Sequence, residues 1–261
     1  MKKKKFYTRL KSWAHNSSES SNPCLRIIGK WMIKTASFLR NMKRCITDKE
    51  FRSVMRMQML HGKKVHQTSQ VTYMNRYPDI FTACKQYFRE LGKKDIKILS
   101  FGCCTGEEVV TLRSYFPEAI IVGADINTRS LKICRQRKLD DKITFIKSSD
   151  RTIKKAGPFD AVFCMAVLHR TPHVIENNNI TDLSDIYSFE KFENQIAELD
   201  GYVKNDGLLI VHITQYDFVD TKTAANYEAY GDYGYSCGLF DKNSQLVHKN
   251  AKRNSIFIKK K

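Results

Sequence analysis

The chain contains the segment Ile98-Leu99-Ser100-Phe101-Gly102-Cys103-Cys104-Thr105-Gly106-Glu107-Glu108, in which a β-rich run leads through a glycine-bracketed turn into helix-forming residues. From Gly92 onward this alternation continues. Further strands are expected at 119–124, 143–146, 159–165, 208–214 and 255–258. Helices are expected at 107–115, 128–137 and 188–203. Strands alternating with helices indicate parallel βαβ units covered on both faces, which is an α/β fold.

The turn between Gly102 and Gly106 lies where an open parallel sheet binds its ligand, beyond the carboxyl end of a strand. Two carboxylates, Glu107 and Glu108, begin the following helix and would repel a phosphate. The dinucleotide pattern G-x-G-x-x-G fails here, because Cys104 and Glu107 occupy its second and third glycine positions. The turn therefore favours a ligand that carries a cationic amine, although both acids could instead act only as helix caps.

Acidic residues also follow the next two expected strands. Asp125 lies 23 residues after Gly102, close to the spacing of about 20 at which an acid binds ribose hydroxyls. Asp150 follows the third strand and its turn, so it is expected at the same edge of the sheet, near the position of an adenine. These positions predict a nucleoside ligand without a 2′-phosphate.

The ordered segments are ILSFGCCTGEEVVTL, IVGADIN, IKSSD, GPFDAVFCMAVLHR and DGLLIVHIT, within roughly residues 94–216. Together they resemble the class I S-adenosylmethionine-dependent methyltransferases. The turn GCCTGEE is most similar to the GC-[ST]-TGEE turn of chemotaxis-receptor glutamate methyltransferases, but the region after it is too short for that family's subdomain. Receptor methylation is therefore not inferred. The resemblance implies a Rossmann-like, doubly wound, mostly parallel seven-stranded sheet and S-adenosyl-L-methionine as cofactor.

The resemblance also implies roles for individual residues, carried over position by position. Gly102, Cys103 and Gly106 would surround the methionine part of the cofactor, and Glu108 would bind its amino group. Asp125 would bind the ribose. Ile126 would lie against the adenine, Asp150 would reach the adenine amine, and Met165 would lie beside the sulfonium. This chain departs from the family at Ser100, where an acid is common, and at Cys104, where a glycine is common.

Two further candidates come from the residues around this domain. Arg76, within Val71–Pro78, could pair with the cofactor's carboxylate as part of a lid, or the segment could be an ordinary helix start. His169 follows the fourth strand of the series and could act as a general base toward an acceptor. Alternatively, it could be packed below the edge of the sheet with no role in the reaction.

The positive charge is concentrated near the N-terminus. Of the formal net charge of +18, residues 1–70 carry 17 Lys and Arg against 3 Asp and Glu. We expect a flexible basic tail at 1–23, a helical extension or lid at 24–92 and the methyltransferase domain at 93–261. The basic region could bind an anionic membrane surface or RNA. We find no run long enough to span a membrane, and we expect a cytoplasmic protein or one peripheral to the inner face of the membrane.

The eight cysteines include no C-x-x-C pair, so neither a metal site nor disulfides are expected. The sequence favours an enzyme that methylates an O or N nucleophile of a small-molecule, glycan or lipid-linked acceptor. Two alternatives stay open: an RNA methyltransferase that uses the basic arm, and a non-catalytic binding protein with the same fold. The sequence does not determine the acceptor or the oligomeric state.

Overall fold

The structure is a computed structural model that describes the backbone of residues 2–260 and the side chains of residues 9–260 except positions 63 and 172. It forms two compact units, one ending at Arg56 and the other beginning at Met57. Within residues 2–260, no helix combines the length and the apolar character that are needed to cross a bilayer.

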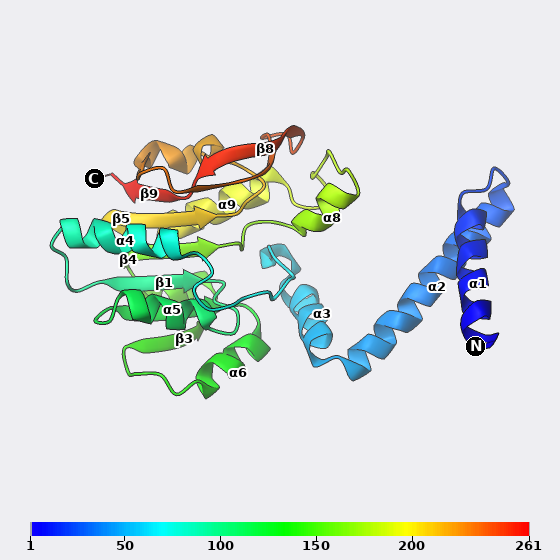
Figure 1. The fold of residues 1–261 in the computed structure, drawn as a ribbon, viewed down its shortest axis with the longest axis horizontal. Coiled ribbons are helices and arrows are strands. Elements are labelled where there is room, and N and C mark those ends of the chain that lie inside the picture. The colour runs from blue at the N-terminus through cyan, green and yellow to red at the C-terminus, as the bar shows by residue number, and fades with distance from the viewer. Residues whose placement is uncertain (1, 261) are drawn as a thin grey trace. The chain divides into compact units, whose positions relative to one another are not determined.

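The first unit is a helical hairpin (Figure 1). It contains α1 (Lys2–Ser18) and α2 (Pro23–Thr47), and it ends within α3 (Lys49–His61). The flexible tail expected at 1–23 is therefore wrong for residues 2–18, which form a helix that packs on α2. Gly29 explains the packing, because a Cβ there would lie 2.4 Å from the Ser18 nitrogen and 2.8 Å from the Ala14 oxygen.

The second unit is built around a seven-stranded sheet with the order β3-β2-β1-β4-β5-β9-β6. The strands are β1 (Lys97–Phe101), β2 (Ile120–Asp125), β3 (Ile143–Lys147), β4 (Phe159–Met165), β5 (Val203–His212), β6 (Tyr227–Ala229) and β9 (Ile256–Lys259). The first five run parallel, whereas β9 is antiparallel to both β5 and β6. This arrangement confirms the predicted mostly parallel, doubly wound α/β sheet.

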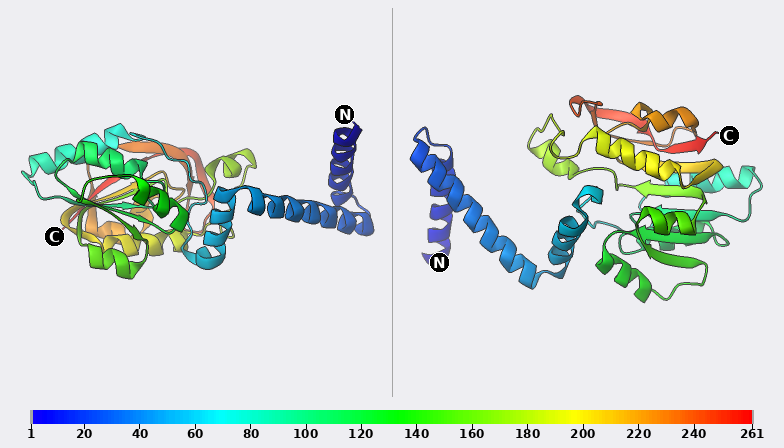
Figure 2. Two further views of the ribbon diagram at one scale, coloured as in Figure 1. Left: turned by 90° about the horizontal axis from the view of Figure 1, so that it is seen from below. Right: turned by 180° about the vertical axis from the view of Figure 1, so that it is seen from behind.

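Helices cover both faces of this sheet (Figure 2). One apolar cluster joins α4 (Pro78–Glu90), α5 (Glu107–Tyr115) and α6 (Thr128–Gln136) to alternate strand residues such as Ile98 and Phe163. The other apolar cluster joins α7 (Asp150–Ala156) and α9 (Phe189–Asp200) to the strand residues that lie between those, such as Leu99 and Val162. Residues one apart on a strand point to opposite faces, so both faces need apolar side chains. The sequence prediction lacked α7 and β6. It also lacked α8 (Pro172–Asn177) and the antiparallel pair β7 (Gly234–Phe240) and β8 (Leu246–Asn254).

The domain boundary expected at residue 92 is placed too late in the chain. Ile80, Phe81, Cys84 and Phe88 of α4 are buried in the same apolar cluster as Ile98 of β1. Helix α4 is therefore part of the sheet-containing unit rather than of an N-terminal extension.

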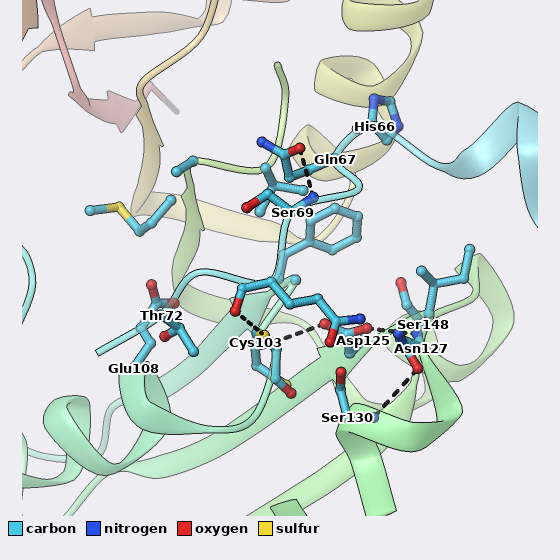
Figure 3. A pocket seen from close by; sticks show the side chains of 18 of the residues that line it. His66, Gln67, Ser69, Thr72, Cys103, Glu108, Asp125, Asn127, Ser130 and Ser148 are labelled. Carbon is cyan, nitrogen blue, oxygen red and sulfur yellow. Dashed lines mark hydrogen bonds between the residues drawn. The ribbon is translucent and has the colours of Figure 1, made fainter. Parts of the chain in front are cut away.

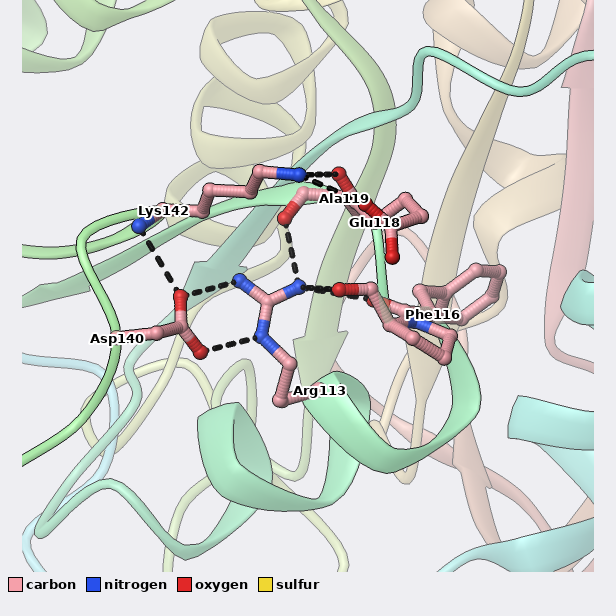
Figure 4. A network of polar contacts seen from close by, with 7 residues as sticks. Arg113, Phe116, Glu118, Ala119, Asp140 and Lys142 are labelled. Atoms are coloured by element: carbon pink, nitrogen blue, oxygen red, sulfur yellow. Dashed lines mark hydrogen bonds and ion pairs between the residues drawn. The ribbon is translucent and has the colours of Figure 1, made fainter.

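An arginine fixes the end of the sheet where β2 and β3 begin (Figure 4). Arg113 donates to both carboxylate oxygens of Asp140 at 2.9 Å. It also donates to the backbone oxygens of Phe116, Pro117 and Ala119. This bidentate pairing joins the C-terminal turn of α5 to the loop before β3. It holds one end of β2 while the other end contributes to the cavity described below.

A buried carboxylate joins β4 to its surroundings. Asp160 is fully buried, and it accepts from Lys93 Nζ at 2.6 Å, Lys204 Nζ at 3.0 Å and the Lys97 N–H at 2.8 Å. Burial by itself raises the pKa of this carboxyl, but the two lysines and the N–H bring the pKa below its usual value. Asp160 therefore contributes stability above the unfolded pKa, and that contribution is lost as the pH falls through the folded pKa.

We expect Asp160→Asn to lower the free energy of unfolding by about 2 kcal/mol, because two ammonium groups lose their countercharge. This is less than for a fully buried pair, since both lysine side chains are about one-third exposed. The measurement is urea unfolding at pH 7. Asp232→Asn is the matched control, because Asp232 also pairs with a lysine but is 83% exposed, and it should cost under about 0.5 kcal/mol. Equal losses in both variants would contradict the expectation.

Candidate active site

A cavity lies at the carboxyl ends of β1, β2 and β4 (Figure 3). Its lining includes Gly102 and Cys103 after β1, Asp125 at the end of β2, and Met165 at the end of β4. Parallel strands end at one edge of the sheet, so residues far apart in the sequence meet there. The remaining predicted residues in the lining are Ile126, Glu108 and Arg76.

The glycine turn has the left-handed backbone that its sequence suggests. Gly102 has φ +76° and Gly106 has φ +92°, a region that costs residues with a Cβ about 1–2 kcal/mol. Cys104 has φ +49°, so the position where the family commonly has glycine keeps that conformation. Gly106 is not in the lining of the cavity; it begins α5, where a Cβ would lie 3.3 Å from Cys134 Sγ. It shapes the turn rather than the cavity wall.

Asp125 fastens the turn to the end of β2. Its Oδ2 accepts from the Cys104 N–H at 2.8 Å, and its Oδ1 accepts from the Asn127 N–H at 2.6 Å. Burial raises the pKa of Asp125 to about 6, against the effect of these N–H donors. At neutral pH the group is mainly ionised. Each carboxylate oxygen has a second lone pair, so Asp125 can also accept hydrogen bonds from a ligand's hydroxyls.

The two neighbouring acids of the turn have different roles. Glu107 forms an ion pair with Arg137 and accepts from the Thr105 hydroxyl, so it is held within the protein. Glu108 lines the cavity and accepts from the Ser100 hydroxyl at 2.7 Å. Burial raises the pKa of Glu108 to about 7, although Ser100 and Arg76 oppose the rise. Ser100, which stands where the family commonly has an acid, thus orients the acid that faces the cavity.

Arg76 brings a positive charge to the same cavity. Its Nη1 donates to the Val71 oxygen at 2.9 Å, and its guanidinium lies 5.3 and 5.1 Å from the ring centres of Tyr73 and Tyr77. These contacts hold the guanidinium at the cavity wall, with Glu108 also in the lining. A carboxylate binder and an ammonium binder in one cavity match the two charges of an α-amino acid.

Several buried polar atoms of the lining have no hydrogen-bond partner among the residues that the structure describes. They are Tyr77 Oη, Ser130 Oγ and Gln195 Nε2. A buried unpaired polar atom costs about 1–3 kcal/mol, and native proteins rarely keep one without a reason. All three residues line this cavity, which indicates a polar ligand with several hydrogen-bonding groups. The sugar, base and amino-acid parts of S-adenosylmethionine fit that requirement.

The chain's own segment 64–73, here called the covering segment, forms another wall of the cavity. His66 anchors it, with Nδ1 at 2.7 Å from Tyr187 Oη and Nε2 at 3.1 Å from Gln195 Oε1. Lys191 Nζ donates to the Val65 oxygen at 2.8 Å. Burial lowers the pKa of His66 to about 4, so the ring is neutral at pH 7. The sequence analysis placed a lid at 71–78 and missed this earlier part, whose only sequence signal is a polar run between two helices.

Besides Gly106, two predicted residues lie outside the cavity lining. Asp150 pairs with Lys154 at 3.0 Å and accepts from Tyr202 Oη at 3.1 Å, while Ser148 and Ser149 line the cavity in its place. The Asp150 carboxylate is therefore engaged by the protein rather than directed at the adenine position.

His169 is the other predicted residue outside the lining. Its Nε2 lies 2.9 Å from the Ala166 oxygen and 2.8 Å from Gln67 Nε2. Gln67 Nε2 also lies 3.3 Å from Nδ1, so both ring nitrogens contact groups of the protein itself. Burial lowers the pKa of His169 to about 4. The geometry favours a positioning role between the covering segment and the β4 loop over the general-base role expected from the sequence.

A second cavity adjoins the first and shares Arg76 and Tyr77 with it. His212, at the end of β5, lines this second cavity with Asp232 and Tyr233. Its Nδ1 lies 2.8 Å from the Ser255 hydroxyl, and its ring packs edge-on against Tyr77 with centroids 4.5 Å apart. His212 was not a predicted site residue, because its position within an apolar strand suggests a sheet residue. Only the register that pairs it with Met165 shows it at the edge of the site.

Comparison with known proteins agrees with this geometry. Residues 98–182 match the family described as "Methyltransferase domain". A tRNA (guanine-N(7)-)-methyltransferase of Chloroflexus aggregans (strain MD-66 / DSM 9485) is 31% identical over 88 residues, which are 33% of this chain and 39% of that protein. The chain thus matches well under half of the length of this curated relative.

Two methyltransferases are among the solved structures to which this chain is similar at low identity. The plantazolicin methyltransferase BpumL in complex with SAH is similar at 14% identity and a TM-score of 0.38, over 69% of this chain and 60% of that one. Precorrin-6y C5,15-methyltransferase from Geobacter metallireducens GS-15 is similar at 12% identity and a TM-score of 0.42, over 73% and 94%. This chain is therefore similar to a methyltransferase domain over residues 98–182, and its second unit has a mostly parallel α/β sheet.

Proposed function

We propose that this protein is an S-adenosylmethionine-dependent methyltransferase. The observation that supports this most is the convergence of Arg76, Glu108 and Asp125 on one cavity at the carboxyl ends of β1 and β2. Arg76 binds the carboxylate of the cofactor's amino-acid part, and Glu108 binds its ammonium group. Asp125 accepts hydrogen bonds from the ribose. Asp150, in contrast, has no contact in the structure that supports its expected adenine role.

The bound cofactor supplies an activated methyl group, so the protein's task is to align it with a nucleophile and to exclude water. The covering segment excludes water from one side, because His66 holds it closed. Met165, at the end of β4, lines the first cavity, and its register partner on β5, His212, lines the second. Methyl transfer between the two cavities then needs no obligatory protein nucleophile.

The acceptor is proposed to be a small molecule, a glycan or a lipid-linked compound that presents an O or N nucleophile. The second cavity, lined by His212, Tyr233 and Asp232, supports this, because it is contiguous with the cofactor cavity through Tyr77. Burial lowers the pKa of His212 to about 4, so its ring is neutral at pH 7 and can accept a hydrogen bond from an acceptor hydroxyl. The proposed location is the cytoplasm.

Titration calorimetry with S-adenosylmethionine and S-adenosylhomocysteine tests the proposal directly. We expect both to bind the full chain, and we expect Glu118→Ala, an exposed acid far from the cavity lining, to bind equally well. A methyl-donor assay with labelled cofactor and fractionated cell extract then identifies the acceptor by mass. A folded protein that binds neither compound would refute the proposal.

The affinity for S-adenosylmethionine should depend on pH through Glu108. A protonated Glu108 cannot pair with an ammonium group, so affinity should rise as the pH passes the folded pKa of about 7. We expect about an eightfold increase between pH 6 and pH 7.5, which follows from the ionised fraction. Calorimetry at both pH values measures it. Glu108→Gln should show a weaker affinity that changes only about twofold over this range, which is the part due to Asp125 with its pKa of about 6. The same pH dependence in both proteins would exclude Glu108 as its source.

RNA is a second candidate acceptor. The curated relative is named as a tRNA methyltransferase, and residues 1–70 carry 17 basic against 3 acidic residues. Such a region would neutralise phosphates, so RNA affinity should fall steeply with salt. A gel-shift titration with total tRNA between 50 and 200 mM salt tests this, and weak or salt-independent binding would remove this candidate. A non-catalytic protein with the same fold is the remaining alternative, and turnover of any acceptor would exclude it.

A further inference from the structure

Helix α2 carries a row of exposed apolar side chains along its length, here called the apolar stripe. It consists of Ile27, Trp31, Phe38, Leu39, Met42 and Ile46. At 100° per residue these positions fall within about a third of the helix circumference. The most exposed members are Trp31, at 69%, and Ile46, at 74%. From Ile27 to Ile46 the stripe is about 28 Å long.

The partner helix of the hairpin does not cover this stripe. Helix α1 packs on α2 at Gly29, where the close approach of Ala14 and Ser18 leaves no room for a side chain. Gly29 and Trp31 are two positions apart, so they point about 200° apart around the helix. The hairpin therefore forms through the other side of α2. Large apolar patches that remain exposed in a folded unit mark binding surfaces.

The same helix is strongly cationic. Its exposed charged residues are Arg26, Lys30, Lys34, Arg40, Lys43 and Arg44, and no acidic residue occurs between positions 20 and 47. Most of these cations lie on the side away from the stripe or at its border. An apolar face with Trp and Phe opposite a Lys- and Arg-rich face is typical of helices that lie in a membrane interface. Long basic side chains at the border can reach anionic headgroups while their stems stay in apolar surroundings.

We propose that the apolar stripe and the cations of α2 dock this protein on an anionic phospholipid surface, with the helix lying in the membrane plane. RNA would neutralise the cations but leave the stripe in water. A second copy pairing through the stripe would cover the apolar side chains but would offer the cations no anionic surface. An anionic bilayer satisfies both faces at once, with attraction of about 1 kcal/mol for each basic residue near the surface. This proposal does not depend on the methyltransferase activity.

Flotation of the full chain with vesicles tests the proposal. We expect binding at least tenfold tighter to phosphatidylcholine vesicles with 30% phosphatidylglycerol than to phosphatidylcholine alone. Trp31→Ser with Phe38→Ser should weaken binding at least tenfold, and so should Lys30→Glu with Lys34→Glu. The matched control is Val219→Ser with Val247→Ser, which removes exposed apolar side chains of the second unit and should leave binding unchanged.

A second measurement keeps the apolar stripe intact, so it does not depend on whether the stripe variants fold. The chain has two tryptophans, so Trp13→Phe leaves Trp31 as the sole emitter. Its fluorescence should shift to shorter wavelength when anionic vesicles are added. Three results would overturn the proposal: no binding of the full chain to anionic vesicles, undiminished binding by the stripe variant, or a dimer that the stripe variant dissociates without any vesicle binding. RNA binding in the absence of vesicle binding would overturn it equally.

Discussion

Replacing Asp125 by alanine should weaken the binding of S-adenosylmethionine at least 100-fold, which corresponds to about 2.7 kcal/mol. Two losses add up. The ribose loses a charged acceptor, and hydrogen bonds to charged groups contribute about 1.5–3 kcal/mol. The Cys104 and Asn127 N–H groups also lose the carboxylate that orients them, so the turn around the amino-acid part becomes less ordered. Calorimetry of both proteins at pH 7.5 measures the difference.

The Asp125 prediction needs a variant that separates these two losses. Asp125→Asn keeps one side-chain oxygen for an N–H of the turn but removes the charge, so its affinity should lie between those of the native protein and Asp125→Ala. Thermal unfolding of the unliganded proteins shows whether the turn still folds. An unchanged affinity in Asp125→Ala would show that the ligand does not lie at the end of β2, contrary to the proposed function.

The variant Gly102→Ala should lose about 3 kcal/mol of stability together with most of its cofactor affinity. The φ of +76° at this position destabilises a residue with a Cβ by about 1–2 kcal/mol. The new Cβ would also lie 2.6 Å from Val167 Cγ2, which a β-branched side chain cannot easily avoid. Overpacking of this kind costs about 1–3 kcal/mol. Val167 lines the cavity, so its displacement should also disturb the ligand.

Two further variants separate the backbone cost from the clash. Gly92→Ala has a similar φ of +64° with nothing within 4 Å of the new Cβ, so it should lose only about 1 kcal/mol. Val167→Ala combined with Gly102→Ala should recover part of the loss, as a double-mutant cycle in urea unfolding would reveal. Equal losses at Gly92 and Gly102, with no recovery in the double variant, would refute the clash.

Much of the sheet could be predicted from the sequence, because its signals are local. The parallel strands β1 to β5 are short apolar runs bounded by turns, and β-rich runs alternating with helices indicate βαβ units. The position of Asp125 follows from the same logic, since the carboxyl ends of parallel strands share one edge of the sheet. Elements with weak local signals were missed: β8 reads as a polar run, LVHKNAKRN, and its pairing with β7 provides the stability that its composition does not.

Helix α1 and the end of the N-terminal unit could not be predicted from local sequence, because both depend on tertiary packing. Residues 2–18 are too polar to suggest a buried face, yet they form a helix that packs on α2 where Gly29 lets the backbones approach. The sequence of helix α4 shows an amphipathic pattern, and that pattern is the same whether the helix packs on the sheet or belongs to an N-terminal extension. Only its contacts with β1 assign it to the sheet-containing unit rather than to the extension.

The sequence by itself determined the order of strands and helices, the glycine turn and the acids Glu108 and Asp125, because each depends on residues close together in the chain. Tertiary structure decided which of these groups face the cavity. It turned Asp150 toward Lys154 and Tyr202, and it fixed His169 between Gln67 and a carbonyl. It also joined His66 to Gln195 across 129 residues. A side chain's direction depends on partners brought near by folding, and no local pattern encodes those partners.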